Sequence, residues 1–313
     1  MDLLLTSGHA TQVNLEMSWS LGAIVCANGL LYPLDRVDFR QWVRRVSRGT
    51  ASGGYWFAST NCVTLRQEWA ANTKIQPLKA STHPKVFFGV GNCLIGDTLG
   101  IRDSMVTAWL GRAGVDQFVA YTIPTWYGKG GWGALDLWQG AAGNLSLAEA
   151  LFLNNQRILW RLQKENPRLL EVSCPNEDLN SPDDHAAIAE IERAPKDQQR
   201  DQLGMVYDRD ALVLYGDPLR DVRLDAARQQ DKVNWSWEKL SGGGLELKLA
   251  SRDGFSSDAF PVLLPQRMRG MQVVAGGEFN PVLNDEFILF PDLKLAKGGG
   301  LVVRIAPAVP VSK

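Results

Sequence analysis

The chain has 313 residues, 45% of them hydrophobic and 21% charged, so it is long enough for two domains and has the usage of a globular protein. Its 33 Lys and Arg balance its 34 Asp and Glu, which gives no support to a nucleic-acid or anionic-membrane partner, since both require a basic surface. No apolar run approaches the roughly 18 residues of a membrane helix, and no basic segment precedes Leu3-Leu4-Leu5 as in a signal peptide. We therefore expect no nucleic-acid partner, no membrane partner and no localisation signal in this chain.

Few residues are available for thiol, imidazole or metal chemistry. The four cysteines lie far apart in the sequence, without a C-x-x-C pair, which argues against a disulfide scaffold and a structural zinc site. Of the three histidines, His83 precedes Pro84 at the start of a predicted strand, and His185 lies in a polar segment typical of a solvated helix start. We predict that both are structural, and we predict no metal and no cofactor.

The first two thirds of the chain alternate between strand and helix patterns. In chain order, the predicted elements are a strand at 2–6, a hairpin at 21–34, a strand at 86–90, a helix at 103–113, a strand at 117–123, a loop at 124–133, a helix at 146–165, a loop with a surface helix at 175–204 and a strand at 211–215. Asn28-Gly29 favours a hairpin turn, and Ser146 with Glu149 has capping-box spacing. This alternation predicts an α/β domain with a mostly parallel sheet and flanking helices.

After about residue 224 the hydrophobic period changes to two. Val233, Trp235 and Trp237 alternate with polar residues, and a Leu-rich run at 245–249 follows a glycine-rich turn. Further strands are predicted at 272–275, 286–290 and 301–305. The sequence thus predicts two domains, an α/β domain at 1–223 and a small antiparallel β-sandwich at 224–313.

Two residues suited to acyl transfer follow directly on predicted buried strands. His9 comes after the first strand and Cys93 after the strand at 86–90. The carboxyl ends of parallel strands line one edge of a sheet, so the two side chains converge if their strands are neighbours. A lone Cys or His at such a place is usually structural, but the matching positions and the small residues around both favour a nucleophile and its base.

The order of several short motifs resembles that of the caspase-like cysteine peptidases, and the gingipain-type branch is the closer match. The motifs are Ser7-Gly8-His9 after a strand, Gly91-Asn92-Cys93 after a second strand, the Cys-x-x-Gly pattern at 93–96, the helix and strand at 105–123, and Leu214-Tyr215-Gly216-Asp217-Pro218. The resemblance covers residues 1–223 by motif and the remainder by architecture, because an immunoglobulin-like sandwich also follows the gingipain catalytic domain.

The resemblance implies a cysteine endopeptidase that cuts peptide bonds through a thioester, with a peptide or protein as substrate and an exported parent protein. His9 would be the base and acid and Cys93 the nucleophile. Backbone N–H groups would hold the oxyanion, at Gly8, Ala10 and Asn92 besides Cys93 itself. Walls of the substrate pocket would come from Thr122, Trp126, Tyr127 and Trp132. Asp97, Asp103 and Asp136 are equivalent candidates to select a basic side chain.

Departures from the family pattern motivate an alternative of a different class. Ala10 replaces the usual Gly, residues 38–82 look like an insertion, and only eight residues precede His9. The alternative is an inactive binding module of caspase-like fold that uses the Trp-rich loop and the sandwich. The abrupt start also predicts that the strand before His9 has an unpaired outer edge, open to a missing N-terminal segment or a second chain.

Overall fold

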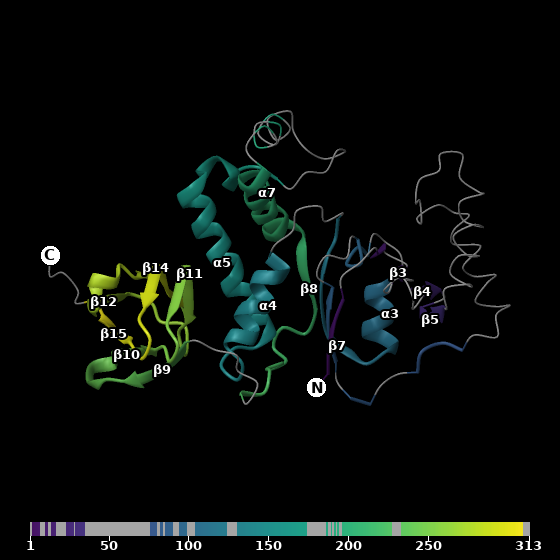
Figure 1. Ribbon diagram of the computed structural model, residues 1–313. Coiled ribbons are helices and arrows are strands. Elements are labelled where there is room, and N and C mark those ends of the chain that lie inside the picture. Colours follow the sequence, from purple (N-terminus) through teal and green to yellow (C-terminus); the bar gives the residue numbers. More distant parts are fainter. Residues whose placement is uncertain are drawn as a thin grey trace. The chain divides into compact units, whose positions relative to one another are not determined.

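The computed structural model describes most of the chain after residue 104 and shorter segments before it (Figure 1). The described residues are 2–6, 10–11, 14–16, 23–27, 29–34, 76–79, 82–83, 85–89, 94–98, 104–123, 130–173, 186, 189, 191, 193, 196–226 and 233–308. None of the helices in these ranges combines the length and the apolar character that crossing a membrane requires. The chain divides into two compact units, residues 1–131 with 172–220 and residues 132–171 with 221–313.

A mixed four-stranded sheet is the centre of the first unit. Its strands, in spatial order, are β1 (Asp2–Leu5), β6 (Lys85–Gly89), β7 (Val115–Tyr121) and β8 (Leu212–Gly216). The first three run parallel and β8 runs antiparallel to β7. Residues 86–89 are all buried, as the apolar run predicts for a strand covered on both faces. The mostly parallel sheet predicted for this part of the chain is confirmed.

Helix α3 (Met105–Arg112) packs beside this sheet, as Figure 1 shows. The helix begins at a capping box in which Ser104 Oγ accepts from the Thr107 backbone and the Thr107 hydroxyl accepts from the Ser104 backbone. It ends before Gly114, whose φ of 77° is the left-handed conformation that glycine adopts most easily. The buried face of α3 includes Trp109, which contacts Phe87 of β6.

A second sheet of the first unit is an antiparallel meander. Its strands are β2 (Ala10–Thr11), β3 (Asn14–Glu16), β4 (Ala23–Ala27) and β5 (Leu30–Leu34). Strands β4 and β5 form the hairpin that the Asn-Gly pair predicts, with Gly29 at a φ of 69°. The unit also contains helix α7 (Lys196–Ala211), which runs directly into β8.

The second unit contains α4 (Gly130–Gly140) from Trp132 on, α5 (Leu147–Glu165) and the short 3-10 helix η1 (Pro167–Leu170). Ser146 and Glu149 form the predicted capping box at the start of α5. The predicted loop at 124–133 is shorter than expected, because helix α4 already begins at Gly130.

Two antiparallel sheets complete the second unit. In spatial order, the four-stranded sheet contains β12 (Met271–Ala275), β15 (Gly300–Pro307), β10 (Leu245–Ala250) and β9 (Asn234–Lys239), and the three-stranded sheet contains β11 (Phe255–Leu263), β14 (Phe287–Leu295) and β13 (Val282–Leu283). The 3-10 helices η3 (Ser241–Gly243) and η4 (Gly277–Phe279) lie in their connections. Inward residues of both sheets, such as Leu247, Phe290 and Val303, share one apolar core. The protein is therefore α/β, with a mostly parallel mixed sheet and further antiparallel sheets.

Candidate active site

The strands that precede His9 and Cys93 are neighbours. Strand β1 pairs in parallel with β6, from Asp2 opposite Lys85 to Leu5 opposite Phe88. The pairing continues one residue further, because the Thr6 N–H donates to the Phe88 carbonyl over 3.1 Å. Both strands therefore end at the same edge of the mixed sheet, which is the carboxyl edge where ligands bind in open parallel sheets. The two strands are thus neighbours, as the hypothesis of a shared site requires.

Most of the predicted site residues lie outside the described part of the chain. These are His9, Cys93, Gly8, Asn92, Trp126 and Tyr127. Ala10 and Thr122 are described with their side chains, and Trp132 is described as a residue of helix α4. Because Ala10 directly follows His9 and Leu94 directly follows Cys93, the structure does describe an immediate neighbour of each predicted catalytic residue.

Ala10 is the first residue of strand β2 and pairs with Leu15 of β3. Only 6% of its surface is exposed, and it belongs to the apolar core that includes Phe87 and Phe118. The residue after His9 thus has extended backbone, which alanine adopts without strain. Alanine at this position is therefore compatible with the local backbone.

The residues after Cys93 form a tight turn at the carboxyl end of strand β7. The Leu94 N–H donates to the Ile123 carbonyl over 3.2 Å, and the Gly96 N–H donates to the Tyr121 carbonyl over 2.9 Å. Leu94 has a φ of 56°, a left-handed conformation that costs a non-glycine residue roughly 1–2 kcal/mol. Backbone strain held by surrounding hydrogen bonds is characteristic of functional turns, and here it adjoins the predicted nucleophile.

This turn is held against the mixed sheet by the close packing of Gly96 on β7 and by a hydrogen bond from Tyr215. A Cβ on Gly96 would lie 2.9 Å from the Tyr121 carbonyl oxygen, so only glycine fits so close to β7. The Gly96 carbonyl accepts a hydrogen bond of 2.6 Å from the Tyr215 hydroxyl of β8. Burial raises the pKa of Tyr215, the charge of nearby Asp97 raises it further, and a hydrogen bond with Thr98 lowers it. Asp97 is itself buried, with 5% exposed.

Helix α7 supports the carboxyl end of β7 from another direction. The Thr122 N–H and hydroxyl both donate to the Ala211 carbonyl, at 3.0 Å and 3.3 Å. One residue earlier, the buried Tyr121 hydroxyl donates to the buried carboxylate of Asp208 on α7. Thr122 is thus at the predicted edge, and its hydroxyl is engaged with the α7–β8 junction.

Sequence reasoning missed three residues of this region, which are Leu94, Tyr215 and Asp208. Tyr215 was part of a motif but had no expected contact, because it is 119 residues away in sequence from Gly96, to which its hydroxyl donates. Asp208 lies in a polar helical stretch, where a carboxylate normally indicates a solvated face. The left-handed φ of Leu94 could not be predicted from the residue type, because leucine rarely adopts a positive φ.

The remaining predicted residues fall elsewhere. Asp103 and His185 lie outside the described residues, and Asp136 lies on α4, where burial raises its pKa while the charge of Arg157 lowers it. His83 is exposed at the amino end of β6, the end opposite to the predicted catalytic edge. Within the described ranges, no three His, Cys, Asp or Glu side chains are grouped as metal ligands would be.

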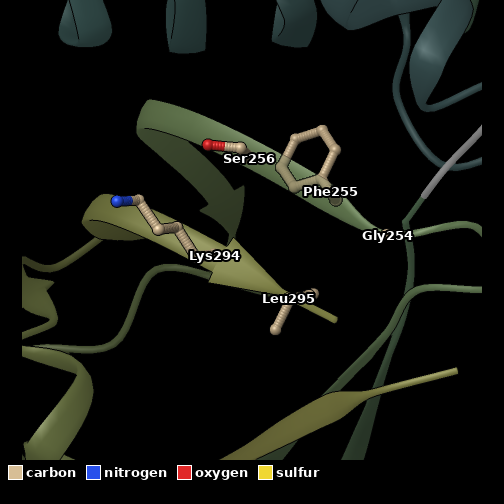
Figure 2. A pocket seen from close by; sticks show the side chains of 5 residues that line it. All are labelled: Gly254, Phe255, Ser256, Lys294 and Leu295. Atoms are coloured by element: carbon tan, nitrogen blue, oxygen red, sulfur yellow. The ribbon is translucent and has the colours of Figure 1, made fainter. Parts of the chain in front are cut away.

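The β-rich part of the second unit has an open hollow of about 550 Å³ between the start of β11 and the end of β14. Figure 2 shows its lining side chains, Phe255, Ser256, Lys294 and Leu295, together with Gly254. Ser256 faces Lys294 across the strand pair, and Phe255 faces Leu295. The lining contains one cation and one hydroxyl but no thiol, imidazole or carboxylate, so it lacks the groups for nucleophilic catalysis.

The carboxyl edge of the mixed sheet is therefore the best candidate for an active site, on geometry alone. Comparison of the chain with protein-family models, with curated proteins and with solved structures finds no match.

Proposed function

We propose that the chain is a cysteine-type endopeptidase of the gingipain-like, caspase-like kind, with His9 and Cys93 as its catalytic dyad. The observation that carries the proposal is the parallel pairing of β1 with β6, which ends the His9 and Cys93 strands at one sheet edge. The strained and hydrogen-bonded turn after Cys93 adds support, because a nucleophile needs a fixed backbone beside it. The antiparallel sheets after residue 233 agree with a gingipain-like order of an α/β domain and an immunoglobulin-like sandwich.

The proposed chemistry has two balanced steps. The Cys93 thiolate attacks the carbonyl carbon of the scissile peptide bond, and the C–N bond breaks as protonated His9 gives its proton to the leaving amine. The resulting thioester is then attacked by water, whose proton goes to His9, and the Cys93 thiolate leaves as the new carboxylic acid forms. Backbone N–H groups at Gly8, Ala10, Asn92 and Cys93 would bind the oxyanion of each tetrahedral intermediate.

A covalent probe tests the nucleophile. An acyloxymethylketone peptide should label wild-type protein at Cys93, as located by peptide mapping with mass spectrometry, and Cys93→Ala should abolish that label. Cys26→Ala is the matched control, because Cys26 is fully buried and its thiol lies 3.5 Å from the Ser104 carbonyl. Equal labelling of the Cys93→Ala and wild-type proteins would refute the assignment.

A pH profile tests the role of His9. An imidazolium beside a thiol lowers the pKa of that thiol, so the wild-type protein should already react with iodoacetamide at about pH 6.5. In His9→Ala the reaction at Cys93 should follow an ordinary thiol and rise only near pH 8.5. Identical pH profiles for the two proteins would show that His9 does not affect the reactivity of the Cys93 thiol.

The inactive binding module stays the second candidate, motivated by the long segment at 38–82 and the few residues before His9 rather than by Ala10, which fits its backbone. Under this alternative Cys93 has the reactivity of an ordinary thiol in both proteins, and no peptide in a cleavage library is cut. Cleavage by wild-type protein that is lost in Cys93→Ala excludes the binding module.

A further inference from the structure

A second candidate site lies at the opposite end of the mixed sheet from the carboxyl edge. It is a pocket of about 320 Å³. Its lining residues are Leu3, Leu4, Leu78, Lys79, Lys85, Trp109 and Ala113. Lys85 is the first residue of β6, and Ala113 follows α3 just before β7 begins. The pocket therefore lies at the amino ends of β6 and β7, away from the predicted catalytic edge.

The pocket adjoins an open sheet edge. Among the described residues, β1 pairs with β6 and with no other strand. Backbone groups of successive strand residues point alternately to the two sides, and the Thr6 N–H points to β6. The backbone groups of Leu3 and Leu5 therefore point to the outer side, where no described strand pairs with them. Among the described strands, β1 is thus the outermost of the mixed sheet.

The charges of the pocket have one sign. Lys79 is exposed and Lys85 half-buried, and in the ranges that the structure describes neither forms a salt bridge. Lys85 Nζ is 3.5 Å from the His83 carbonyl, and the described residues that line the pocket include no carboxylate. The buried Trp109 indole is part of the apolar wall. Two cations beside apolar walls favour a ligand that is apolar in part and anionic in part.

We infer that the β1 edge binds an extended, acidic peptide segment of a partner protein as an added strand. Backbone hydrogen bonds would form with Leu3 and Leu5, one apolar side chain would enter the pocket, and a neighbouring carboxylate would meet Lys79 and Lys85. The volume suits a single large side chain and is at the lower limit for small-molecule sites.

Charge decides between this occupant and a second copy of the chain. In a symmetric dimer the same patch lies on both subunits. Two copies paired along β1 would therefore bring Lys79 and Lys85 of one subunit close to the same lysines of the other. Like charges across an interface disfavour that pairing, whereas the carboxylates of an acidic strand would neutralise the two lysines.

Peptide binding to the full chain tests the inference, with Cys93→Ala as a second sample in which the peptide stays uncut. The probe is a short fluorescein-labelled peptide of alternating Leu and Glu residues, measured by fluorescence anisotropy. The Leu and Glu peptide should bind at least about tenfold more tightly than the matched Leu and Lys peptide. Methylation of the backbone nitrogens of the Leu and Glu peptide should weaken its binding by a similar factor. The double variant K79E/K85E should reverse the preference and bind the Leu and Lys peptide more tightly.

Equal affinity for the two peptides would refute the charge argument, and an unchanged affinity after N-methylation would refute strand addition. Light scattering that finds a dimer, with the peptide unable to dissociate it, would assign the edge to a second copy and overturn the inference. Peptide affinity and labelling of Cys93 are separate measurements, so this inference and the proposed peptidase fail independently.

Discussion

Two glycines in the first unit have opposite surroundings. A Cβ on Gly96 would lie 2.9 Å from the Tyr121 carbonyl oxygen and 3.1 Å from the Ala120 carbonyl carbon, whereas a Cβ on Gly111 of α3 would have no atom within 4 Å. Gly96→Ala should lower the free energy of unfolding by about 1–3 kcal/mol, because backbone atoms must move. Gly111→Ala should raise it by about 0.5–1 kcal/mol through helix propensity.

Urea denaturation of the two variants measures these changes. If Gly96→Ala matched Gly111→Ala in stability, the turn after Cys93 would not be packed against β7 as described. The Gly96→Ala variant should also lose labelling at Cys93, because the turn beside the proposed nucleophile shifts.

Tyr215 couples the stability of the same turn to pH. Removal of its hydroxyl in Tyr215→Phe deletes the 2.6 Å bond to the Gly96 carbonyl and should lower the free energy of unfolding by about 0.5–1.5 kcal/mol at neutral pH. Burial raises the pKa of Tyr215 above that of an unfolded tyrosine, so the protonated phenol stabilises the folded state.

This contribution is complete below the unfolded pKa of about 10 and is lost as pH rises through the higher folded pKa. The stability difference between wild type and Tyr215→Phe should therefore shrink above about pH 10. Thermal unfolding across pH 7 to 11 measures it. If the stability difference between wild type and Tyr215→Phe stayed constant over this pH range, ionisation of Tyr215 would not contribute to the stability of the fold.

At the scale of elements, the four-stranded sheet of the second unit has an alternating row of charges. Lys248 lies 2.7 Å from Glu238 and 3.3 Å from Glu246, and Arg304 lies 2.5 Å from Glu246. The hydrogen bond from Arg304 holds the pKa of Glu246 below its usual value, and the bond from Lys248 lowers it further. The carboxylate therefore stabilises this sheet when it is ionised.

Glu246→Gln should lower Tm at pH 7, and the difference from wild type should shrink as pH falls below the ordinary Glu pKa of about 4.3. The reason is that a depressed pKa contributes stability above the unfolded pKa and loses it as pH falls through the folded one. The control is Glu278→Gln, at an exposed carboxylate for which the described residues provide no ion pair, and its Tm should equal that of wild type. A Tm difference for Glu246→Gln that persisted unchanged at pH 3 would contradict the electrostatic origin.

Elements specified by local sequence were predictable. The β4–β5 hairpin follows from Asn28-Gly29, and the start of α5 follows from Ser146 and Glu149, because each signal lies within a few residues of its effect. The adjacency of β1 and β6 was predicted only as a condition, since about eighty residues separate these strands and no local pattern specifies which strands pair.

Helix α4 and strand β11 are among the elements that were missed, and in both the residues have contrary propensities. Helix α4 begins with Gly130, Gly131 and Gly133, and glycine is a poor helix former, so the segment was predicted as a loop. Strand β11 contains polar residues at 256–258 and Pro261, which argues against a strand. The proline is tolerated because β11 lies at the edge of its three-stranded sheet.

For the whole molecule, the sequence predicts a domain boundary at residue 223, whereas the compact units also place residues 132–171 with the C-terminal strands. Within the second unit, Phe152 of α5 contacts Phe287 of β14 edge to face, with ring centroids 6.1 Å apart, and Arg161 lies 3.0 Å from Asp258 of β11. These contacts make α5 part of the structure that stabilises the three-stranded sheet.

Phe152→Ala should therefore destabilise the second unit selectively, by about 1–3 kcal/mol for a half-buried ring. Hydrogen exchange by mass spectrometry should show faster exchange in β11 and β14 and unchanged exchange in β6 and β7. Phe118→Ala is the counterpart in the first unit, since Phe118 is fully buried and stacks on Phe87, and it should give the reverse pattern. Faster exchange only in β6 and β7 for Phe152→Ala would assign α5 to the first unit.

The contact of α5 with strands far downstream has a consequence for synthesis on the ribosome. Helix α5 ends at Glu165, but its partner strand β14 begins only at Phe287. At roughly 5–20 residues per second, translation takes on the order of ten seconds to make the segment between them. During that interval the Phe152 ring of the nascent helix lacks Phe287, its edge-to-face partner in the finished structure. The order of the chain thus leaves an apolar side chain of this helix without its downstream partner during synthesis, which is the kind of exposure that chaperones cover.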